Sequence, residues 1–325
     1  MLSSIKRRIR RHFARHKAVI LAYHGVMGAP LTFPLSQHLG VERFEWQMRY
    51  LAENCRCVPL SRLVQEIRRH RIEPYSVAVT FDDGFRNNYS NALPILRRYG
   101  VPATIFLPAG YIGTDRLLWP EALACYLAAS DRETLALDGQ TLSLRTPADK
   151  ASAYGAITRH LKGYRANRVD DFISGLRASL GLAPTEPGPS AMRTQFEFLS
   201  WDEARAMRGS GLIEIGSHSV HHRRLAQLSA DEARYEITES KRILERELGE
   251  TPYFAYPYGG RPQDFDDVHR KMAIAAGYQA IITAMHGTVQ SGSDPYELPR
   301  VYITCDTTDT DFDYLLQGGA AFMTH

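Results

Sequence analysis

The 325-residue sequence predicts an α/β protein built on a parallel sheet or barrel. Short apolar runs alternate with stretches of helical periodicity, which favours parallel strands joined by helical crossovers. Two of the apolar runs, 76–81 and 211–216, end in aspartates and histidines, as strands do when they deliver polar groups to a site. Apolar residues make up 44% of the chain and charged residues 23%, which is ordinary for a soluble protein.

The first half of the chain supplies most of the alternation. Buried strands are expected at 18–23 and 76–81, with a further strand at 103–108. Helical periodicity covers 42–54 and 61–69, where Ser61 is the expected N-cap. Residues 87–99 are expected to be helical despite Pro94 and to end at Gly100, a suitable C-cap.

Residues 117–200 interrupt the alternation of strands and helices. The segment contains helical stretches near 120–129, 147–162 and 169–180, followed by a loop rich in proline and glycine at 181–190. We interpret it as an insertion between two strands of the sheet or barrel. The insertion forms one side of a substrate cleft, or alternatively it is a peripheral addition that does not contact substrate.

The last third of the chain resumes the alternation of strands and helices. Ser229 and Glu232 form a capping box that opens a long helix to about Leu248. The remaining expected elements are a helix at 201–208 and strands at 211–216, 254–256, 279–283 and 300–304.

Asp82 and Asp83 stand side by side at the end of a buried apolar run, directly before Gly84. Their mutual repulsion is worsened by desolvation, and a divalent cation relieves it. The alternative is an ordinary strand-end turn, since Asp-Gly is common turn chemistry.

His218 and His222 are four residues apart. On a helical turn this spacing places both imidazoles on one face, close enough to share a metal. A surface cluster or a set of loop partners is the alternative. Two histidines with one carboxylate form a common open catalytic set, so we expect a divalent metal. Zinc is the first choice, with cobalt, nickel or manganese as alternatives.

Three motifs resemble those of the polysaccharide deacetylases, carbohydrate esterase family 4. Thr80–Gly84 resembles the first motif, His218–His222 resembles the second, and Phe254–Gly259 is similar to a variant of the third. The resemblance runs from about Val19 to about Thr304. It implies a distorted (β/α)7 barrel with a mostly helical insertion, in which the carboxyl ends of the strands carry the site residues.

The resemblance also implies roles for these residues. Asp82 would be the general base, while Asp83, His218 and His222 would hold the metal, whose open position takes a water and the acetyl carbonyl oxygen. A metal polarises that carbonyl and lowers the pKa of bound water to about 7 in good zinc sites. The expected reaction is metal-dependent removal of an N-acetyl group from an amino sugar in a glycan or glycan precursor.

The sequence departs from the common family pattern in two places. No arginine precedes Pro257 in the third motif, and a later leucine–x–histidine motif is not visible. We hypothesise that Arg300 pairs with Asp82 instead, although a structural ion pair is the alternative. His24, at the end of the first strand, is the candidate general acid, because the branch with exopolysaccharide N-deacetylases of biofilm polymers is similar there. A strand-end histidine bonded to a loop is the alternative for His24, and His286 is a weaker rival for the acid.

Aromatic and proline residues near the motifs are candidate sugar contacts. Trp119, Tyr256, Pro257 and Tyr258 would stack against sugar rings, and core packing is the alternative for each. The alternative functions are deacylation of another amide or an ester, and a catalytically inactive carbohydrate-binding barrel.

The first 17 residues form a basic segment in which Leu2, Ile5, Ile9 and Phe13 fall on one helical face. This pattern predicts an amphipathic helix on an anionic membrane surface, or alternatively a helix that covers the end of the barrel. No apolar region of signal-peptide length follows, and the four cysteines show no disulfide pattern. We therefore expect a cytoplasmic protein with possible peripheral contact at the inner membrane.

The formal net charge of +3 does not indicate a nucleic-acid partner. The expected partner is the acetylated amino-sugar substrate. The expected organisation is a basic segment at 1–17, a catalytic domain at 18–305 with its insertion, and a C-terminal tail at 306–325.

Overall fold

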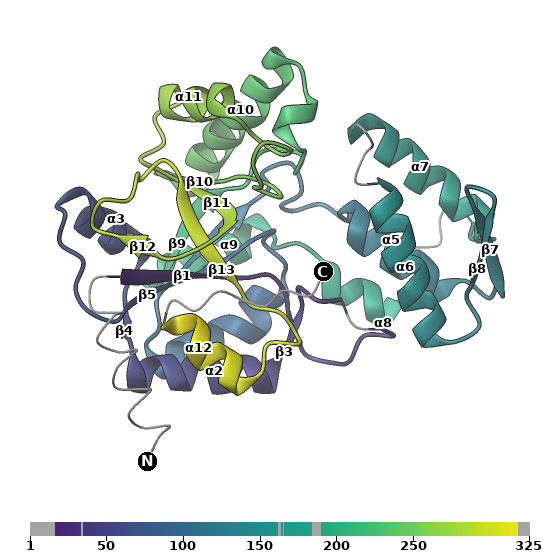
Figure 1. Cartoon of the computed structure of the whole chain (residues 1–325), viewed down its shortest axis with the longest axis horizontal. Helices are drawn as coiled ribbons and strands as arrows, with labels where there is room; N and C mark the ends of the chain where they lie inside the picture. The colour runs from purple at the N-terminus through teal and green to yellow at the C-terminus, as the bar shows by residue number, and fades with distance from the viewer. Residues whose placement is uncertain (1–16, 34, 162–163, 165, 184–189, 318–325) are drawn as a thin grey trace.

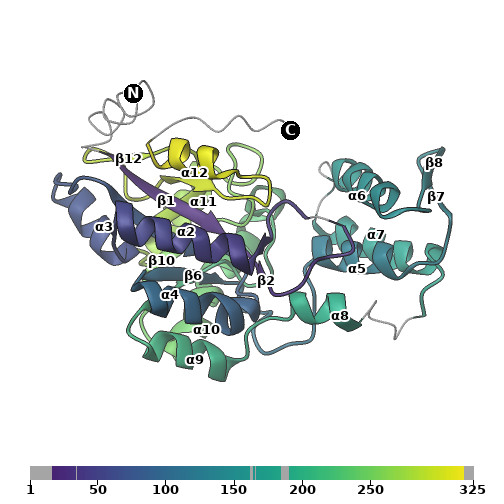
Figure 2. The ribbon, with the colours of Figure 1, turned by 90° about the horizontal axis from the view of Figure 1, so that it is seen from below.

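The computed structural model describes residues 17–33, 35–161, 164, 166–183 and 190–317. Within this part of the chain, seven parallel strands close into a barrel (Figures 1 and 2). Each strand pairs with its neighbours in the ring, and β1 closes it by pairing with β5 on one side and β13 on the other. In spatial order the strands are β1 (Lys17–Tyr23), β13 (Leu298–Tyr302), β11 (Ala280–His286), β10 (Tyr253–Ala255), β9 (Ile213–Ser217), β6 (Ala103–Leu107) and β5 (Ser76–Phe81). The expected distorted (β/α)7 barrel is confirmed.

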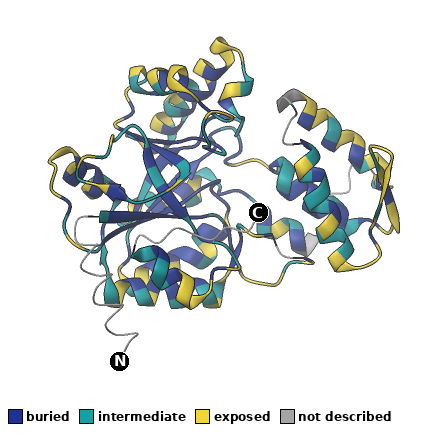
Figure 3. Ribbon diagram, viewed as in Figure 1, coloured by how far each residue is buried: buried dark blue, intermediate teal, exposed yellow. Residues whose placement is uncertain are grey.

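The barrel strands are almost continuously buried, as Figure 3 shows. Strands β5 and β6 are buried at every position, which explains why their sequences are unbroken apolar or small-residue runs. Short strands extend this framework. They are β4 (Arg56–Cys57) beside β5, β12 (Val289–Gln290) antiparallel to β1, and the pair β2 (Val26–Met27) and β3 (Leu39–Gly40).

Helices surround the barrel (Figure 2). They are α2 (Val41–Asn54), α3 (Leu60–Arg68), α4 (Leu93–Tyr99), α9 (Trp201–Gly209), α10 (Ala230–Leu248), α11 (Asp267–Ala275) and α12 (Asp309–Leu316). Ser229 opens α10 with the expected capping box. The expected C-terminal tail at 306–325 includes α12, whose Phe312 is buried in the main core against Trp46 and Tyr50 of α2.

Two helix predictions need correction. Helix α3 begins at Leu60 with Pro59 as its N-cap, so the expected Ser61 cap was wrong. The single helix expected over 87–99 is a π-helical turn, Asn88–Ala92, followed by α4. Pro94 lies in the first turn of α4, where its missing N–H breaks no helical hydrogen bond. Gly100 caps α4 in the left-handed conformation with φ 65°, as predicted.

The insertion forms a helical lobe beside the barrel (Figure 1). Because β6 pairs directly with β9, residues 117–200 are inserted between neighbouring barrel strands. The lobe contains α5 (Trp119–Ala129), α6 (Pro147–Leu161), α7 (Ala166–Ser179), the short α8 (Ser190–Arg193) and the hairpin β7 (Thr134–Leu137) with β8 (Gln140–Ser143). Its apolar residues belong to the same core cluster as the barrel, so the lobe packs on the barrel rather than standing apart.

None of the helices in the described ranges is long and apolar enough to cross a bilayer. The basic segment at 1–17 falls outside the described residues except for Lys17, which begins β1.

Candidate active site

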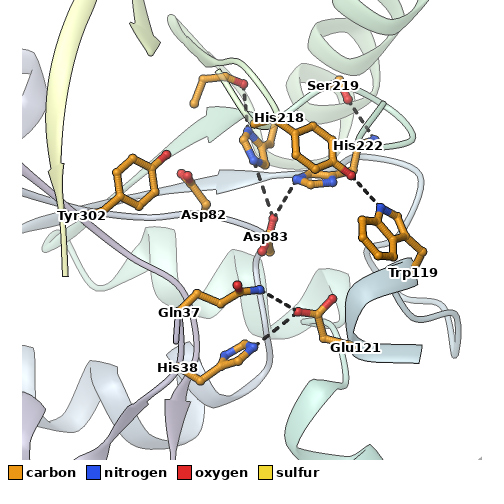
Figure 4. Close-up of polar contacts among 12 residues, drawn as sticks. Gln37, His38, Asp82, Asp83, Trp119, Glu121, His218, Ser219, His222 and Tyr302 are labelled. Atoms are coloured by element: carbon orange, nitrogen blue, oxygen red, sulfur yellow. Dashed lines mark hydrogen bonds and ion pairs between the residues drawn. The ribbon is translucent and has the colours of Figure 1, made fainter. Parts of the chain in front are cut away.

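The carboxyl ends of the barrel strands bring the predicted site residues together (Figure 4). Asp82 and Asp83 follow β5, His218 and His222 follow β9, and His24 follows β1. All five line one cavity of about 470 Å³. This is the end of a parallel barrel at which loops and strand ends converge, as expected for a site in such a fold.

The turn after β5 lets both aspartates face the cavity. On a regular strand, successive side chains point to opposite faces. Here Asp83 has φ 71° and Gly84 has φ 69°, so the chain turns sharply after Asp82. A Cβ on Gly84 would lie 2.5 Å from Leu107 Cδ2, and the position therefore requires glycine. A positive φ at an aspartate carries a backbone cost of the kind found at functional sites.

Three ligand atoms converge beside this turn. Oδ1 of Asp83 lies 3.2 Å from Nε2 of His222 and 3.6 Å from Nε2 of His218. The three atoms lie within 4.8 Å of one another, and Asp83 is buried. One carboxylate and two imidazole nitrogens are suitable ligands for a divalent transition metal.

The hydrogen bond of His218 prepares it to act as a ligand. Its Nδ1 lies 2.8 Å from the carbonyl oxygen of Ala255, an acceptor, so Nδ1 carries the proton and donates it. Nε2 then presents its lone pair toward Asp83. A backbone carbonyl behind a histidine ligand is the usual means of fixing its orientation.

Electrostatics favour the same assignment. Burial lowers the pKa of His218 to about 4, which keeps this imidazole neutral near pH 7. Burial alone would raise the pKa of Asp83, but the neighbouring histidines, with His222 foremost, together hold that pKa well below its usual range. Burial alone would lower the pKa of His222, but the nearby carboxylates, with Asp83 foremost, together raise that pKa. A cation at this position would therefore compete with a proton on His222.

The expectation that His218 and His222 share a helical turn was wrong. Residues 218–222 form an irregular loop in which Ser219 has φ 63° and His222 has φ 54°. The Ser219 hydroxyl accepts a hydrogen bond from the backbone N–H of His222 at 3.0 Å. The rings still meet, with centroids 4.9 Å apart, because the loop folds back on itself.

Sequence reasoning missed Glu236, which holds this loop. Its carboxylate accepts hydrogen bonds from the backbone N–H groups of Val220 and His221 at 2.9 and 2.7 Å, and it pairs with Nδ1 of His221 at 2.8 Å. The signal was present in the helical pattern, because Glu236 falls on the buried face of α10 beside Ala233 and Ile237. A glutamate on an otherwise apolar face indicates a buried polar partner.

Arg300 lies against Asp82, as hypothesised. Its NH1 and NH2 donate to Oδ1 and Oδ2 of Asp82 at 2.7 and 2.8 Å, which is a bidentate pair. Arg300 is fully buried and also donates to the Thr283 carbonyl and the Tyr302 hydroxyl. Burial alone would raise the pKa of Asp82, but Arg300, together with His218 and His24, lowers that pKa, so Asp82 is ionised at neutral pH. Arg300 lies in the middle of β13 rather than at its start.

The two candidate acids differ in position. His24 lines the cavity beside Tyr302, with ring centroids 5.8 Å apart, and its Nδ1 is buried with no hydrogen-bond partner in the described part of the chain. Burial lowers the pKa of His24. His286 is exposed at the end of β11 and does not line the cavity.

Of the four candidate sugar contacts, two line the cavity and two do not. Trp119 and Tyr258 line the cavity, and the indole N–H of Trp119 donates to the Tyr258 hydroxyl at 2.8 Å. Tyr256 is buried in a core cluster, with its ring stacked on Phe265 at 4.0 Å. Neither Tyr256 nor the buried Pro257 lines the cavity, so core packing accounts for both.

A parallel barrel with an aspartate–histidine–histidine site at its carboxyl ends defines a class of metal-dependent hydrolases. The family model of the polysaccharide deacetylases matches residues 70–281, more than half of the chain. The chain belongs to the polysaccharide deacetylase family and carries a candidate metal site at Asp83, His218 and His222.

Curated relatives match over shorter stretches. YxkH of Bacillus subtilis (strain 168) is 32% identical over 110 residues, which cover 33% of this chain and 37% of that protein. The poly-beta-1,6-N-acetyl-D-glucosamine N-deacetylase of Staphylococcus aureus (strain N315) is 31% identical over 74 residues, 22% of this chain and 26% of that protein. The matched stretches thus span well under half of each relative.

Solved structures share the fold over nearly the whole chain. The Streptococcus pyogenes deacetylase PplD in complex with acetate superposes with a TM-score of 0.59 at 17% identity, covering 94% of this chain and 99% of that one. IcaB from Ammonifex degensii gives a TM-score of 0.59 at 19% identity, with 93% and 97% covered. At these identities the likeness establishes the fold alone.

Proposed function

We propose that the protein is a metal-dependent N-deacetylase of an amino sugar within a glycan or glycan precursor. The observation that carries the proposal is the convergence of Asp83, His218 and His222 beside the Asp82–Arg300 pair in one cavity. A divalent ion held by the first three residues would polarise an acetyl carbonyl and acidify a water molecule. Zinc fits this ligand set, and cobalt, nickel or manganese are alternatives.

The protein groups divide the remaining work. Asp82 is ionised and buried next to the ligand set, so it can take a proton from an attacking water. Arg300 fixes the plane of that carboxylate through two hydrogen bonds. His24 approaches the same cavity from β1 and is the group proposed to protonate the leaving amine nitrogen.

The size and lining of the cavity support a sugar substrate. A cavity of about 470 Å³ is within the range of small-molecule sites. Trp119 offers an aromatic surface, and the Staphylococcus aureus relatives are named for N-acetyl-D-glucosamine polymer deacetylation. The alternatives are deacylation of a different amide or of an ester at the same site, and a barrel that binds carbohydrate without turnover.

Mass spectrometry of a substrate panel tests this proposal. Metal-loaded protein would be incubated with N-acetylglucosamine oligosaccharides, nucleotide-linked and lipid-linked N-acetylamino sugars, and O-acetylated sugars. We expect loss of one acetyl mass from an N-acetylated member and release of free amine. Loss only from O-acetylated members would favour the esterase alternative, and binding without any loss would favour the inactive barrel.

Replacing His24 tests the proposed general acid. His24→Ala should slow amide hydrolysis by about 10²- to 10⁴-fold, because the amine must be protonated to leave. Hydrolysis of 4-nitrophenyl acetate, whose leaving group needs no proton, should slow far less. Rates on both substrates would be measured for wild type, His24→Ala and the matched control His286→Ala, which alters an exposed histidine. Equal slowing of the amide and the ester by His24→Ala would contradict the role.

The basic segment at 1–17 is proposed to bind an anionic membrane surface, which would keep the protein at the inner membrane if it is cytoplasmic. Each nearby Lys or Arg contributes about 1 kcal/mol to such binding, and salt screens the attraction. Sedimentation with phosphatidylserine-containing vesicles should therefore recover the full chain at low salt and less of it at high salt. Deleting residues 1–15 should abolish binding and spare activity on a soluble sugar. A truncated protein that becomes unstable, with no vesicle binding by the full chain, would favour a helix that covers the barrel.

A further inference from the structure

A buried carboxylate from the insertion lies in the same cavity as the ligand set. Glu121, in the first turn of α5, is 1% exposed and lines the cavity. Its Oε1 accepts a hydrogen bond from Nε2 of Gln37 at 3.1 Å and lies 3.4 Å from Nε2 of His38. Its Oε2 is buried and has no hydrogen-bond partner among the residues that the structure describes. Figure 4 shows Glu121 on the far side of Asp83 from His218, with Oε2 turned away from Gln37 and His38.

The surroundings fix the direction of this carboxylate. The His38 ring packs against Phe85 and Phe196, with centroids 5.3 and 5.1 Å away, and cannot turn freely. Because a carboxylate only accepts hydrogen bonds, Nε2 of His38 must present its proton to Oε1. Gln37 and His38 thus both donate to Oε1 of Glu121, and Oε2 can accept a hydrogen bond from a ligand.

A purely structural explanation leaves Oε2 unaccounted for. Buried carboxylate oxygens are normally satisfied, because leaving one without a partner costs the desolvation of a charged acceptor. Glu121 lies in the first turn of α5, where the helix favours a negative charge. A rigid, buried residue that lines a cavity and has one unpartnered acceptor oxygen is suited to a donor on a ligand.

The neighbours of Glu121 indicate the kind of donor. Trp119 lies two residues earlier on α5 and lines the cavity, as do Tyr154 and Thr158 of α6. An aromatic face beside a carboxylate matches a pyranose ring, which has an apolar face and hydroxyl groups at its edge. All four residues come from the insertion, which therefore walls the cavity.

We propose that Glu121, held by Gln37 and His38, recognises a free hydroxyl of the sugar that occupies the cavity. Oε2 accepts the hydrogen bond from that hydroxyl. This inference rests on the proposed glycan substrate and narrows it to amino sugars with an unmodified hydroxyl on the side facing α5. A sugar that is acylated, linked or deoxygenated at that hydroxyl is rejected, because Oε2 then stays buried without a partner.

Binding of sugar analogues to the full chain tests the inference. The probes are an N-acetylglucosamine disaccharide and its monodeoxy analogues, with dissociation constants measured by calorimetry. Wild type should bind the parent about 10- to 100-fold more tightly than one of the analogues, the range of a hydrogen bond to a charged group. Glu121→Gln should reduce this preference, because Gln37 and His38 hold the amide oxygen and turn the NH₂ toward the ligand. Glu121→Met, which has similar length and no oxygen, should abolish it.

The matched control is Glu133→Gln, which alters an exposed glutamate of the same insertion that pairs with Arg145 at 3.0 Å. It should keep the wild-type preference. Thermal unfolding of each variant establishes that it is folded, and a purely structural role would change the unfolding temperature without changing the preference between parent and analogue. Two substitutions are used so that one poorly folded variant does not decide the result.

Each outcome decides the question. Equal binding of the parent and every analogue by wild type, or an undiminished preference in folded Glu121→Gln and Glu121→Met, overturns the inference. The metal-loaded protein could bind with a preference that depends on Glu121 and yet release no acetate. That result would support the inference about Glu121 and contradict the proposed deacetylase activity. If wild type does not bind the disaccharide at all, both the inference about Glu121 and the proposal of a glycan substrate are overturned.

Discussion

His218→Ala is expected to release the divalent ion and to reduce deacetylation by more than about 100-fold. Loss of a residue that merely supports a metal ligand typically costs about 10- to 100-fold in affinity or activity, and His218 is placed as a ligand itself. The substitution also leaves Asp83 with only one imidazole beside it in a buried site. Elemental analysis of protein purified without chelator should show about one ion per chain for wild type and markedly less for the variant.

A second readout does not depend on activity. A ligand that binds only the folded state stabilises it by about 2.7 kcal/mol at 100 times its dissociation constant. Adding zinc should therefore raise the unfolding temperature of wild type and of the matched control His286→Ala, whose histidine is exposed outside the cavity. The same addition should leave His218→Ala unchanged. Unaltered metal content in His218→Ala would remove this residue from the ligand set.

Asp82→Asn is expected to retain the metal and to lose about 10²- to 10⁴-fold in rate, because an amide cannot take the proton of a water molecule. The structure adds a second effect. Arg300 is fully buried and pairs with Asp82 through two short hydrogen bonds. Removing one charge of a buried pair leaves the other uncompensated, which costs up to about 3–5 kcal/mol of stability.

The double variant Asp82→Asn/Arg300→Met separates the two effects. Asp82→Asn leaves the Arg300 charge buried without its partner, and Arg300→Met removes that charge, so the double variant should recover part of the stability lost in Asp82→Asn. It should remain as inactive as the single variant. Denaturant unfolding and kcat/KM would be measured for wild type, both single variants and the double variant. A metal-loaded Asp82→Asn protein within tenfold of wild-type activity would rule out Asp82 as the base.

The sequence pattern predicted a parallel sheet or barrel and a metal site at Asp82–Asp83 and His218–His222 because those signals are local, whereas the (β/α)7 barrel and the role of each residue were implied by the resemblance to the deacetylase family. A strand that is buried on both faces must be apolar, and the point at which it stops marks the edge where polar groups gather. Asp82, Asp83 and His218 follow such runs directly, His222 lies in the loop that continues from β9, and parallel strands place their carboxyl ends together. Local patterns failed where tertiary contacts overrode them. Ser61 does not cap α3, and the histidine loop is irregular because Glu236 and Ser219 bind its backbone.

Only the closed barrel determined the partners that are distant in sequence. Because β1 pairs with both β5 and β13, Arg300 of β13 lies within hydrogen-bonding distance of Asp82, which precedes it by 218 residues. In the closed barrel His24 lines the cavity, whereas His286 is exposed outside it. Tyr256 packs in the core, whereas Tyr258 faces the cavity. The insertion likewise brought Glu121 to Gln37 and His38. A sequence pattern specifies which face of an element is buried, whereas the identity of the buried partner depends on how the elements assemble.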